Sequence, residues 1–494
     1  MTADIVLCTI NARWSHASFG LRCLRANLGD LRARSAIVEK TLEHRAVDIV
    51  EAIAAHDPKI VGLGVYIWNA SVMLDVARIL KRVRPDVALV IGGPEVSHEI
   101  DAQPIGDVAD VVVAGEGDVA FRDVCARILD RRAARALDFV PDKIVRGGSP
   151  RLDAVAFAYD EYDDVDVKDR VVYVEASRGC PFTCSFCLSA LDDGVRAFPL
   201  GNFLDELDRL HRRGLRHFKF VDRTFNLKID DAARILDFFL ARPDTFAHFE
   251  MIPDRLPAAL RERLARFEPG RVQLEVGIQT LNHETATLIR RRLDVDKIED
   301  NLRFLRDHTG VHVHADLIAG LPGEDFASFA RGFDRLFAWG TAEIQVGILK
   351  RLRGSPLAKD ATEHPAWRVV FDAAPPYQVL STSTLSFEEL QRISRFARAL
   401  DLVHNSGRFP NAAKLLFDRS PFRSFDAFSD WLFRETGARH GIALPRLTEL
   451  IARHLRARGV GDAVVARALE SDLGRDRMPK IMSLPDRQAR RANR

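Results

Sequence analysis

Ser177-Arg-Gly-Cys-Pro-Phe-Thr-Cys-Ser-Phe-Cys-Leu188 contains three cysteines, Cys180, Cys184 and Cys187, in a C-x3-C-x2-C pattern. Thiolates this close together predict one shared soft-metal site, and in a reducing compartment they favour an iron–sulfur cluster. A four-iron cluster bound by three thiolates keeps one iron open to a non-protein ligand. The alternatives are unrelated cysteines or half of a zinc site, but no second C-x2-C pair exists in the chain.

The pattern, including Phe186 directly before the last cysteine, resembles the signature of radical S-adenosylmethionine (SAM) enzymes. The resemblance implies that Cys180, Cys184 and Cys187 bind a [4Fe-4S] cluster, and that its open iron takes the amino and carboxylate groups of SAM. It implies reductive cleavage of SAM to a 5′-deoxyadenosyl radical. The electron would come from an external donor of the flavodoxin or ferredoxin type.

The composition narrows the class of protein. A chain of 494 residues is long enough for two or three domains. Its 72 basic and 70 acidic residues give a formal net charge of +2, so no charge excess favours nucleic acid as a partner. No apolar run reaches the length of a membrane span, and the first residues lack a secretion signal. Cys8, Cys23 and Cys125 lie in apolar patterns typical of buried thiols, so we expect a cytoplasmic protein without disulfides.

Apolar strand-like runs alternate with amphipathic helical runs through residues 1–140. This alternation predicts an α/β domain with a doubly wound, Rossmann-like parallel sheet. Ligands of such sheets bind beyond the carboxyl ends of the strands, and glycines in the loops there let the backbone approach a flat ligand. The loops at these ends are Asn11–Gly20, Trp68–Ser71, Gly92–Glu95 and Gly115–Gly117.

These loops resemble the cobalamin-binding domain that precedes many radical SAM domains, above all in the Ile-Gly-Gly-Pro and Gly-Glu-Gly segments. The resemblance implies a cobalamin cofactor. The usual cobalt-ligating motif, D-x-H-x-x-G, is replaced by Trp14-Ser-His16-Ala-Ser-Phe-Gly20. His16 is therefore a candidate cobalt ligand or a residue that packs over the corrin, and the alternative is a domain that has lost its cofactor. The expected cobalamin contacts are Trp14, His16, Ser71, Gly92, Gly93, Gly115, Glu116 and Gly117.

Residues 141–169 include an acidic run and are expected to form a linker. In residues 170–360 strand and helix patterns alternate again, and polar residues recur on one face of six expected strands. This pattern predicts a partial (β/α)6 TIM-like barrel with a polar lumen. For each residue the alternative is a hydrogen-bonded core position. The polar faces carry Glu175 with Ser177, Phe220 with Asp222, His248 with Glu250, Glu275 with Gly277 and Gln279, His312 with His314 and Asp316, and Glu343 with Gln345.

The segments 275–280 and 316–324 resemble the fourth and fifth strands of a radical SAM subgroup that includes methylthiotransferases and coproporphyrinogen oxidases. The resemblance implies that Gln279 contacts the ribose or carboxylate of SAM and that Glu275 is a buried polar anchor. Many members carry a G-G-E segment where this chain has Val221-Asp-Arg-Thr-Phe-Asn226, so Asp222 is assigned to that neighbourhood. For Arg223 two interpretations remain: it pairs with a carboxylate, or it forms a salt bridge at the surface. The expected SAM contacts are Phe186, Asp222, Glu250, Glu275, Gln279 and Asp316.

A basic cluster, Lys350, Arg351 and Arg353, follows the last expected strand. It is interpreted as a solvated loop or as a site for an anionic group of the substrate.

Residues 361–475 have the apolar spacing of amphipathic helices, and residues 476–494 form a basic tail. The helical part resembles an uncharacterised C-terminal domain of one radical SAM subgroup, which is expected to cap the barrel. The helices are expected at Phe387–Leu400, Ser424–Thr436, Leu444–Ala457 and Asp462–Leu473.

Together these features predict a cobalamin-dependent radical SAM methyltransferase that acts on an unactivated carbon of an unknown substrate. One alternative keeps both cofactors but catalyses a rearrangement or ring closure. Another, a methylthiotransferase-like enzyme, would need a second cluster, and no cysteine follows Cys187. A non-catalytic iron–sulfur redox sensor is the third, although a sensor has no need of a polar barrel lumen.

Overall fold

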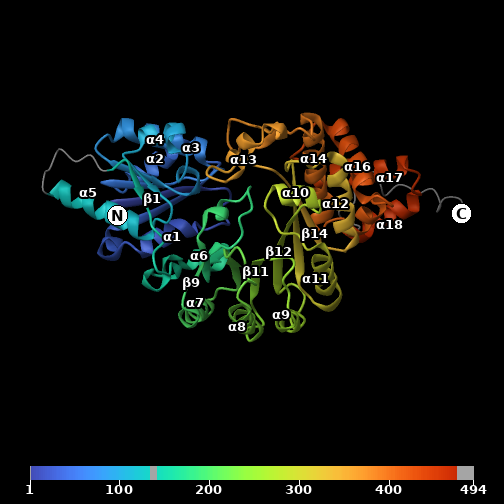
Figure 1. Ribbon diagram of the computed structural model, residues 1–494, viewed down its shortest axis with the longest axis horizontal. Helices are drawn as coiled ribbons and strands as arrows, with labels where there is room; N and C mark the ends of the chain where they lie inside the picture. Colours follow the sequence, from blue (N-terminus) through green and yellow to red (C-terminus); the bar gives the residue numbers. More distant parts are fainter. Residues whose placement is uncertain (1, 134–141, 475–494) are drawn as a thin grey trace, which may run out of the picture.

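The computed structural model describes residues 2–133 and 142–474. Three parts follow one another along the long axis of the molecule: an N-terminal α/β part, a central barrel-like part and a C-terminal group of helices (Figure 1). The predicted tail, residues 476–494, lies outside the described residues.

The N-terminal part is built on a parallel sheet with the strand order β2-β1-β3-β4-β5-β6. All residues of the central strand β1 are buried, because helices cover both faces of the sheet. Helices α2 and α3 pack on the face of Val6 and Cys8, whereas α1 and α5 pack on the face of Ile5 and Leu7. This arrangement confirms the doubly wound prediction. The elements are β1 Ile5–Asn11, α1 Phe19–Ala26, β2 Ser35–Thr41, α2 Ala46–Ala54, β3 Ile60–Gly64, α3 Ala70–Val83, β4 Ala88–Gly92, α4 Pro104–Val108, β5 Val111–Ala114 and α5 Asp118–Ala133.

The sheet has one strand that the sequence did not predict. β6 (Ile144–Arg146) pairs with β5, so the sheet extends past residue 140 into the segment predicted as a linker. A strand of three residues has too little periodicity to be recognised in the sequence. The remaining predicted domain boundaries stay predictions.

A buried ion cluster joins the N-terminal part to α6 (Asp164–Asp169), just before the barrel. Arg22 Nη2 lies 2.8 Å from Glu39 Oε2 and 2.6 Å from Asp166 Oδ2, and Arg170 Nη1 contacts the same two carboxylates. Burial opposes ionisation of Glu39, but the hydrogen bond and charge of Arg22 lower its pKa to about 2. Glu39 therefore stays ionised at neutral pH, and its ion pairs hold the two parts together.

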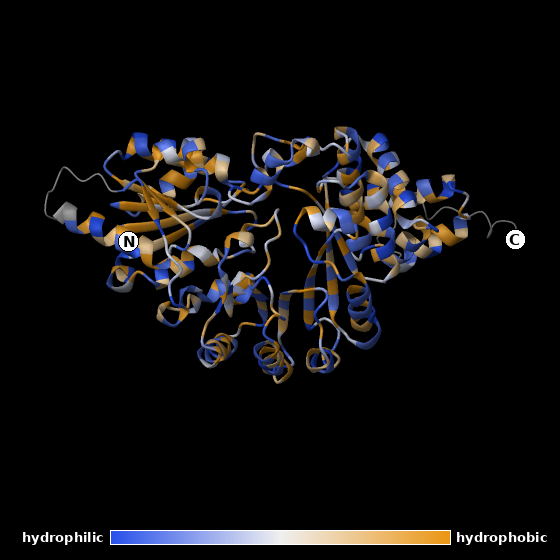
Figure 2. Ribbon diagram, in the orientation of Figure 1, coloured by the Kyte–Doolittle hydropathy of each residue, from blue (hydrophilic) through white to orange (hydrophobic). Residues whose placement is uncertain are grey.

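The central part is an open barrel of six parallel strands, in the order β7-β10-β11-β12-β13-β14 within the described residues. In β12 and β13 buried and half-buried residues alternate strictly, with apolar side chains toward the outer helices and polar ones toward the lumen. Figure 2 shows the same alternation as orange and blue along these strands. The predicted partial barrel is confirmed. Its elements are β7 Val172–Val174, β8 Ser177–Cys180, β9 Gly194–Ala197, α7 Leu200–Arg212, β10 His217–Phe220, α8 Ile229–Leu240, β11 Phe246–Met251, α9 Ala258–Leu264, β12 Val272–Gln279, α10 His283–Leu288, α11 Val295–His308, β13 His312–Ala319, α12 Phe326–Ala338 and β14 Glu343–Ile348.

The C-terminal helices complete the core of the barrel. α14 packs against the edge strand β14. Phe333 of α12, Phe396 of α14 and Phe422 of α16 contact one another, so the three helices share one aromatic cluster. A short hairpin of β15 and β16 is an addition to the predicted helices. No helix in the described part of the chain combines the length and apolar character needed to cross a membrane. The elements are α13 Leu357–Glu363, β15 Val370–Phe371, β16 Val379–Ser381, α14 Phe387–Leu400, α15 Pro410–Leu416, α16 Pro421–Thr436, α17 Leu444–Ala457 and α18 Asp462–Leu473.

Candidate active site

The cysteine segment begins in the antiparallel hairpin of β8 and β9 and is fixed at two further points. Gly179 has φ +95°, and a Cβ at this position would lie 2.1 Å from the carbonyl oxygen of the facing strand, so glycine is required beside Cys180. Ser185 is fully buried. Its N–H donates to the Ile289 carbonyl (3.0 Å) and its carbonyl accepts from the Leu357 N–H (2.8 Å). The loop is thus held between α10 and α13.

The three predicted cluster ligands line one cavity. Cys184 is buried, Cys180 and Cys187 are half-buried, and all three thiols are free. Within residues 2–133 and 142–474, no three His, Cys, Asp or Glu side chains converge on a single-ion site. Each thiolate of a [4Fe-4S] cluster binds a different iron, so its ligands surround a volume instead of meeting at one point. The donor set fits such a cluster. Arg291 Nη1 donates to Cys184 Sγ at 3.7 Å, a contact that can tune cluster potential.

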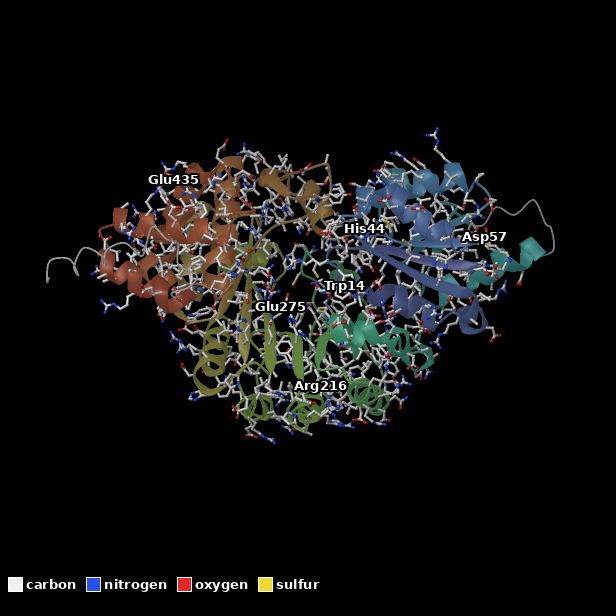
Figure 3. All side chains as sticks on the ribbon, turned by 180° about the vertical axis from the view of Figure 1, so that it is seen from behind. Trp14, His44, Asp57, Arg216, Glu275 and Glu435 are labelled. Carbon is white, nitrogen blue, oxygen red and sulfur yellow. The ribbon has the colours of Figure 1, made fainter. Side chains whose placement is uncertain are left out.

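The same cavity, of about 260 Å³, collects three carboxyls from neighbouring strands: Glu250, Glu275 and Asp316. Burial, together with the charges of Glu275 and Glu250, raises the pKa of Asp316 to about 8. Burial also raises the pKa of Glu250, whereas a 3.1 Å hydrogen bond with His248 lowers the pKa of Glu275. Figure 3 places Glu275 near the middle of the molecule. Arg223, Arg291 and Arg292 line the cavity as well, so its charge is mixed. The row of carboxyls on β11 to β13 suits one cationic group of a ligand, such as the sulfonium of SAM.

Gln279 ends β12 in a strained conformation and lines the cavity. Its φ is +70°, and the pairing register shifts between Gly277 and Gln279. A Cβ at Gly277 would lie 2.5 Å from Gln279 Nε2, so the glycine makes room for the amide. Gln279 Oε1 is buried without a hydrogen-bond partner among the described residues. An open acceptor in a cavity fits a donor such as a ribose hydroxyl. Phe186 lines the same cavity, as predicted.

Asp222 has a different place from the one predicted. It is buried and does not line this cavity: Oδ1 accepts from Ser177 Oγ at 2.6 Å, and Oδ2 accepts from the Ala176 N–H at 3.0 Å. The physical reason is the strand phase, because Asp222 follows the face of Phe220, which is buried against the outer helices. Asp222 therefore supports the start of the cysteine segment. Its neighbour Arg223 lines the cavity and lies 3.3 Å from Glu250 Oε1, as a carboxylate partner.

A second cavity, of about 460 Å³, lies between the carboxyl ends of β3 to β5 and the β8–β9 hairpin. Glycine backbone forms much of its wall. Gly93 has φ +112°, and a Cβ there would lie 2.5 Å from the Val65 carbonyl oxygen. Apolar side chains of α1 and the ring of Tyr66 form a second part of the wall, and charged side chains, among them Arg178 and Arg223, form the rest. A cavity with bare backbone on one side and apolar side chains on the other fits a flat, largely apolar macrocycle such as a corrin. The predicted contacts that line it are Gly92, Gly93, Gly115, Glu116 and Gly117.

Trp14, His16 and Ser71 lie outside this cavity. His16 Nδ1 is 2.6 Å from Tyr173 Oη, and the Arg170 guanidinium donates to the His16 carbonyl at 2.8 Å. Arg170 also lies over the exposed ring of Trp14 at the boundary with the barrel (Figure 3). These contacts draw the first loop toward the barrel, away from the cavity, so the predicted cobalamin contacts of Trp14 and His16 are not supported. Ser71 is exposed on α3.

Arg178 links the second cavity to the cysteine segment, a role that sequence reasoning missed. Its guanidinium contacts Asp118 through Nη1 (2.8 Å) and Nη2 (3.1 Å), Glu116 through Nη1 (2.9 Å) and Glu175 through Nε (2.9 Å). Burial raises the pKa of Glu175 to about 7, against the charge of Arg178. Arg178 and Glu175 line the second cavity, and Arg223 lines both cavities, so the two adjoin.

The predicted basic cluster forms a second contact between the parts. Arg351 Nη2 lies 2.7 Å from Glu99 Oε2, and Arg353 Nε lies 2.9 Å from Glu95 Oε1. Tyr377 Oη also donates to Glu95 Oε1, at 2.7 Å. Both arginines are therefore paired with carboxylates of the N-terminal part, and neither interpretation from the sequence, a solvated loop or an anion site, describes them. Their partners lie more than 250 residues earlier in the chain, where no local pattern could show them.

Three family models match the chain. Residues 174–336 match the radical SAM superfamily, and residues 6–125 match the B12 binding domain. Residues 365–458 match a family described as a protein of unknown function, DUF4080.

Two curated relatives are methyltransferases. The cobalamin-dependent radical SAM methyltransferase TokK of Streptomyces tokunonensis is 28% identical over 61% of this chain and 48% of its own length. The 2-(S-pantetheinyl)-carbapenam-3-carboxylate methyltransferase of Streptantibioticus cattleyicolor is 26% identical over 80% of this chain and 64% of its own. The chain thus spans about half to two thirds of these relatives. The solved radical SAM methyltransferase TsrM of Kitasatospora setae, with cobalamin and a [4Fe-4S] cluster bound, shares the fold: its TM-score is 0.60 at 15% identity, over 95% of this chain and 100% of that one.

Proposed function

We propose that the protein is a cobalamin-dependent radical SAM methyltransferase acting on an unactivated carbon, because the chain matches both the radical SAM superfamily and the B12 binding domain. The observation that carries the proposal is that the two cofactor cavities adjoin, with Arg223 in the wall of both. Methyl transfer to a substrate carbon needs a radical generator and a methyl carrier within reach of the same atom. The methyltransferase relatives support the same activity.

The residues divide between the two cofactors. Cys180, Cys184 and Cys187 would hold the [4Fe-4S] cluster, and Gln279 would accept a hydrogen bond from SAM. The carboxylate of Glu250, and that of Asp316 at a pH above its raised pKa of about 8, would stabilise the positive charge of SAM. When bound, the cluster and SAM supply a radical that abstracts hydrogen, and cobalamin supplies the methyl group.

Other side chains of the protein would hold the two cofactor sites next to each other and exclude water from the boundary between them. Arg178, with its carboxylate partners on both sides, closes the boundary between the N-terminal part and the barrel. Exclusion of water protects a reactive radical from side reactions. Electrons would come from an external donor of the flavodoxin or ferredoxin type, which is part of the proposal.

The test uses the anaerobically reconstituted full chain with hydroxocobalamin, a strong reductant and SAM. We expect the visible spectrum to show retained cobalamin, and chromatography to show both 5′-deoxyadenosine and S-adenosylhomocysteine. Formation of 5′-deoxyadenosine without cobalamin retention or S-adenosylhomocysteine would contradict methyl transfer and leave a radical SAM enzyme with another reaction.

A further inference from the structure

A third cavity, of about 590 Å³, lies between the carboxyl ends of β13 and β14 and the C-terminal helices. One wall is apolar and comes from the barrel: Ile318, Val346 and Ile348. The opposite wall comes from α14 and from the loop at Arg439 and His440. The C-terminal helices thus do more than cover the barrel, because they enclose a space with it.

This cavity continues, along the barrel lumen, the cavity lined by Cys180, Cys184 and Cys187, which is called the SAM cavity from here on. Asp316 and Ile318 lie two residues apart on β13 and so share one face of the strand. Asp316 lines the SAM cavity and Ile318 lines the third cavity. Phe186, within the cysteine segment, lines both. A molecule in the third cavity would therefore have one end against Phe186, beside the cluster ligands.

The polar lining of the cavity is basic. Lys350 and Arg398 have no ion pair within 4.0 Å in the described part of the chain, and Arg398 Nε is buried without a hydrogen-bond partner. Arg439 donates to the neutral amide of Gln391 at 2.9 Å. The lining has one carboxyl, Asp401, which accepts a 2.9 Å hydrogen bond from Asn405. Burial raises the pKa of Asp401, and the charge of Arg398 opposes that rise, so Asp401 offsets part of the positive charge.

The contrast along α14 shows that this excess of positive charge is specific to the cavity. Arg392 pairs with Asp426 and Arg395 pairs with Asp430, so both neighbouring arginines of the helix have carboxylate partners. Arg398, one turn further on, faces the cavity instead. Guanidinium and ammonium groups that line a cavity in excess of its one carboxyl, without an ion pair within 4.0 Å, suit an oxyanion, which accepts charge-assisted hydrogen bonds from both.

We infer that this cavity is the substrate subsite, and that it takes an organic substrate whose oxyanion, a carboxylate or a phosphate, binds Arg398, Lys350 and Arg439. The apolar part of the substrate lies along Ile318 and Val346 and directs the reacting carbon past Phe186 toward the SAM cavity. This assignment rests on the proposed methyltransferase function.

The test measures binding by isothermal titration calorimetry at low ionic strength, with the reconstituted full chain. The probes are phenyl phosphate and phenylacetate, with 2-phenylethanol as the neutral control. The variants are Arg398→Gln and Lys350→Gln. Lys414→Gln is the matched control, because Lys414 is an exposed lysine of α15 that does not line the cavity. Lys350 is also exposed, so its substitution keeps the test valid if Arg398→Gln does not fold.

We expect at least one anionic probe to bind and 2-phenylethanol to bind about tenfold more weakly or not at all. Each cavity variant should raise the Kd of the anionic probe about tenfold, and Lys414→Gln should leave it unchanged. The tighter of the two anionic probes identifies the oxyanion. Failure of both to bind, equal binding of 2-phenylethanol, or an unchanged Kd in both cavity variants would overturn the inference. Because binding is read without turnover, loss of 5′-deoxyadenosine formation with intact anion binding would count against the proposed function alone.

Discussion

Arg223 and Glu250 meet where the two cofactor cavities adjoin, with Nη1 of the arginine 3.3 Å from Oε1 of the glutamate. Glu250 lines the SAM cavity, and Arg223 lines both cavities. Burial raises the pKa of Glu250, and the charge of Arg223 opposes that rise. This pair therefore places a charged contact between the two cavities.

Cobalamin should tighten SAM binding through this pair. A ligand in the second cavity removes water from Arg223, which strengthens its attraction to Glu250 and keeps the carboxylate ionised for the cationic SAM. We expect cobalamin loading to lower the Kd of SAM by at least about fivefold, and Arg223→Met to reduce the change to less than about twofold. Equilibrium dialysis with labelled SAM measures both. Arg292→Met is the control, since Arg292 lines the SAM cavity alone and is largely exposed.

SAM affinity should rise with pH through the pKa of Asp316. Burial and the neighbouring glutamates raise this pKa to about 8, so Asp316 is protonated below that pH and ionised above it. The ionised form attracts a cationic ligand, so the Kd of SAM should fall between pH 7 and pH 9. Asp316→Asn should reduce this trend and leave the part that comes from the amino group of SAM, which loses its proton in the same pH range.

Because the pKa of Asp316 is raised, the stability of the SAM-free protein should also depend on pH. The unfolded carboxyl loses its proton at lower pH than the folded one, so Asp316 reduces stability as pH rises from about 4 to 8. Asp316→Asn should therefore raise Tm at pH 8 by at least about 2 °C and leave it unchanged at pH 4. A lower Tm at pH 8 would show that Asp316 is not destabilising when ionised.

Gln279→Leu should weaken SAM binding about tenfold without changing the iron content. The buried Oε1 has no partner among the described residues, so the amide is free to accept from the ligand, and one such hydrogen bond contributes roughly 1–1.5 kcal/mol. Gln273→Leu is the matched control on the same strand, because Gln273 does not line the cavity. Equal effects of the two substitutions on the Kd of SAM would refute the assignment.

Arg178→Met should destabilise the boundary between the N-terminal part and the barrel. The substitution leaves Asp118, which is 4% exposed, without its partner, and breaking a buried pair in this way costs about 3–5 kcal/mol. We expect a lower Tm and faster loss of cobalamin on gel filtration. The double variant Arg178→Met/Asp118→Asn should recover part of the Tm, since no unpaired charge then remains on Asp118. If the Tm of the double variant did not recover, the unpaired charge of Asp118 would not be the cause of the destabilisation.

Helices long enough for their apolar residues to recur over several turns could be predicted from the sequence. α14, α17 and α18 have the predicted bounds, because their apolar residues recur over at least three turns, and α14 also begins with a capping box at Ser386. β6 and the β15–β16 hairpin have two or three residues per strand, which is too short for a pattern.

The errors at the site came from side-chain direction. Asp222 was assigned to the lumen although it follows the buried phase of Phe220. The sequence predicts that His16 ligates cobalt or packs over the corrin, whereas Tyr173 and Arg170, more than 150 residues later, hold it toward the barrel. Contacts between residues so far apart in the sequence leave no trace in the local pattern. The three cysteines lie within eight residues, so their spacing could be recognised without knowledge of any long-range contact.

Variants that remove one cofactor and leave the other test most directly whether the two cavities bind different cofactors. Cys184→Ala removes a predicted cluster ligand, and Leu24→Trp fills the second cavity from α1. His16→Ala is the control for cobalamin, since His16 lies outside that cavity and is bonded to Tyr173.

The decisive measurement is the iron and cobalt content of these reconstituted proteins, read by elemental analysis with the visible spectrum. Wild type and His16→Ala should each bind about four irons and about one cobalt per chain. Cys184→Ala should lose iron and keep cobalt, and Leu24→Trp should lose cobalt and keep iron. A wild-type protein without iron–sulfur absorbance, or a cluster that survives in Cys184→Ala, would contradict the account.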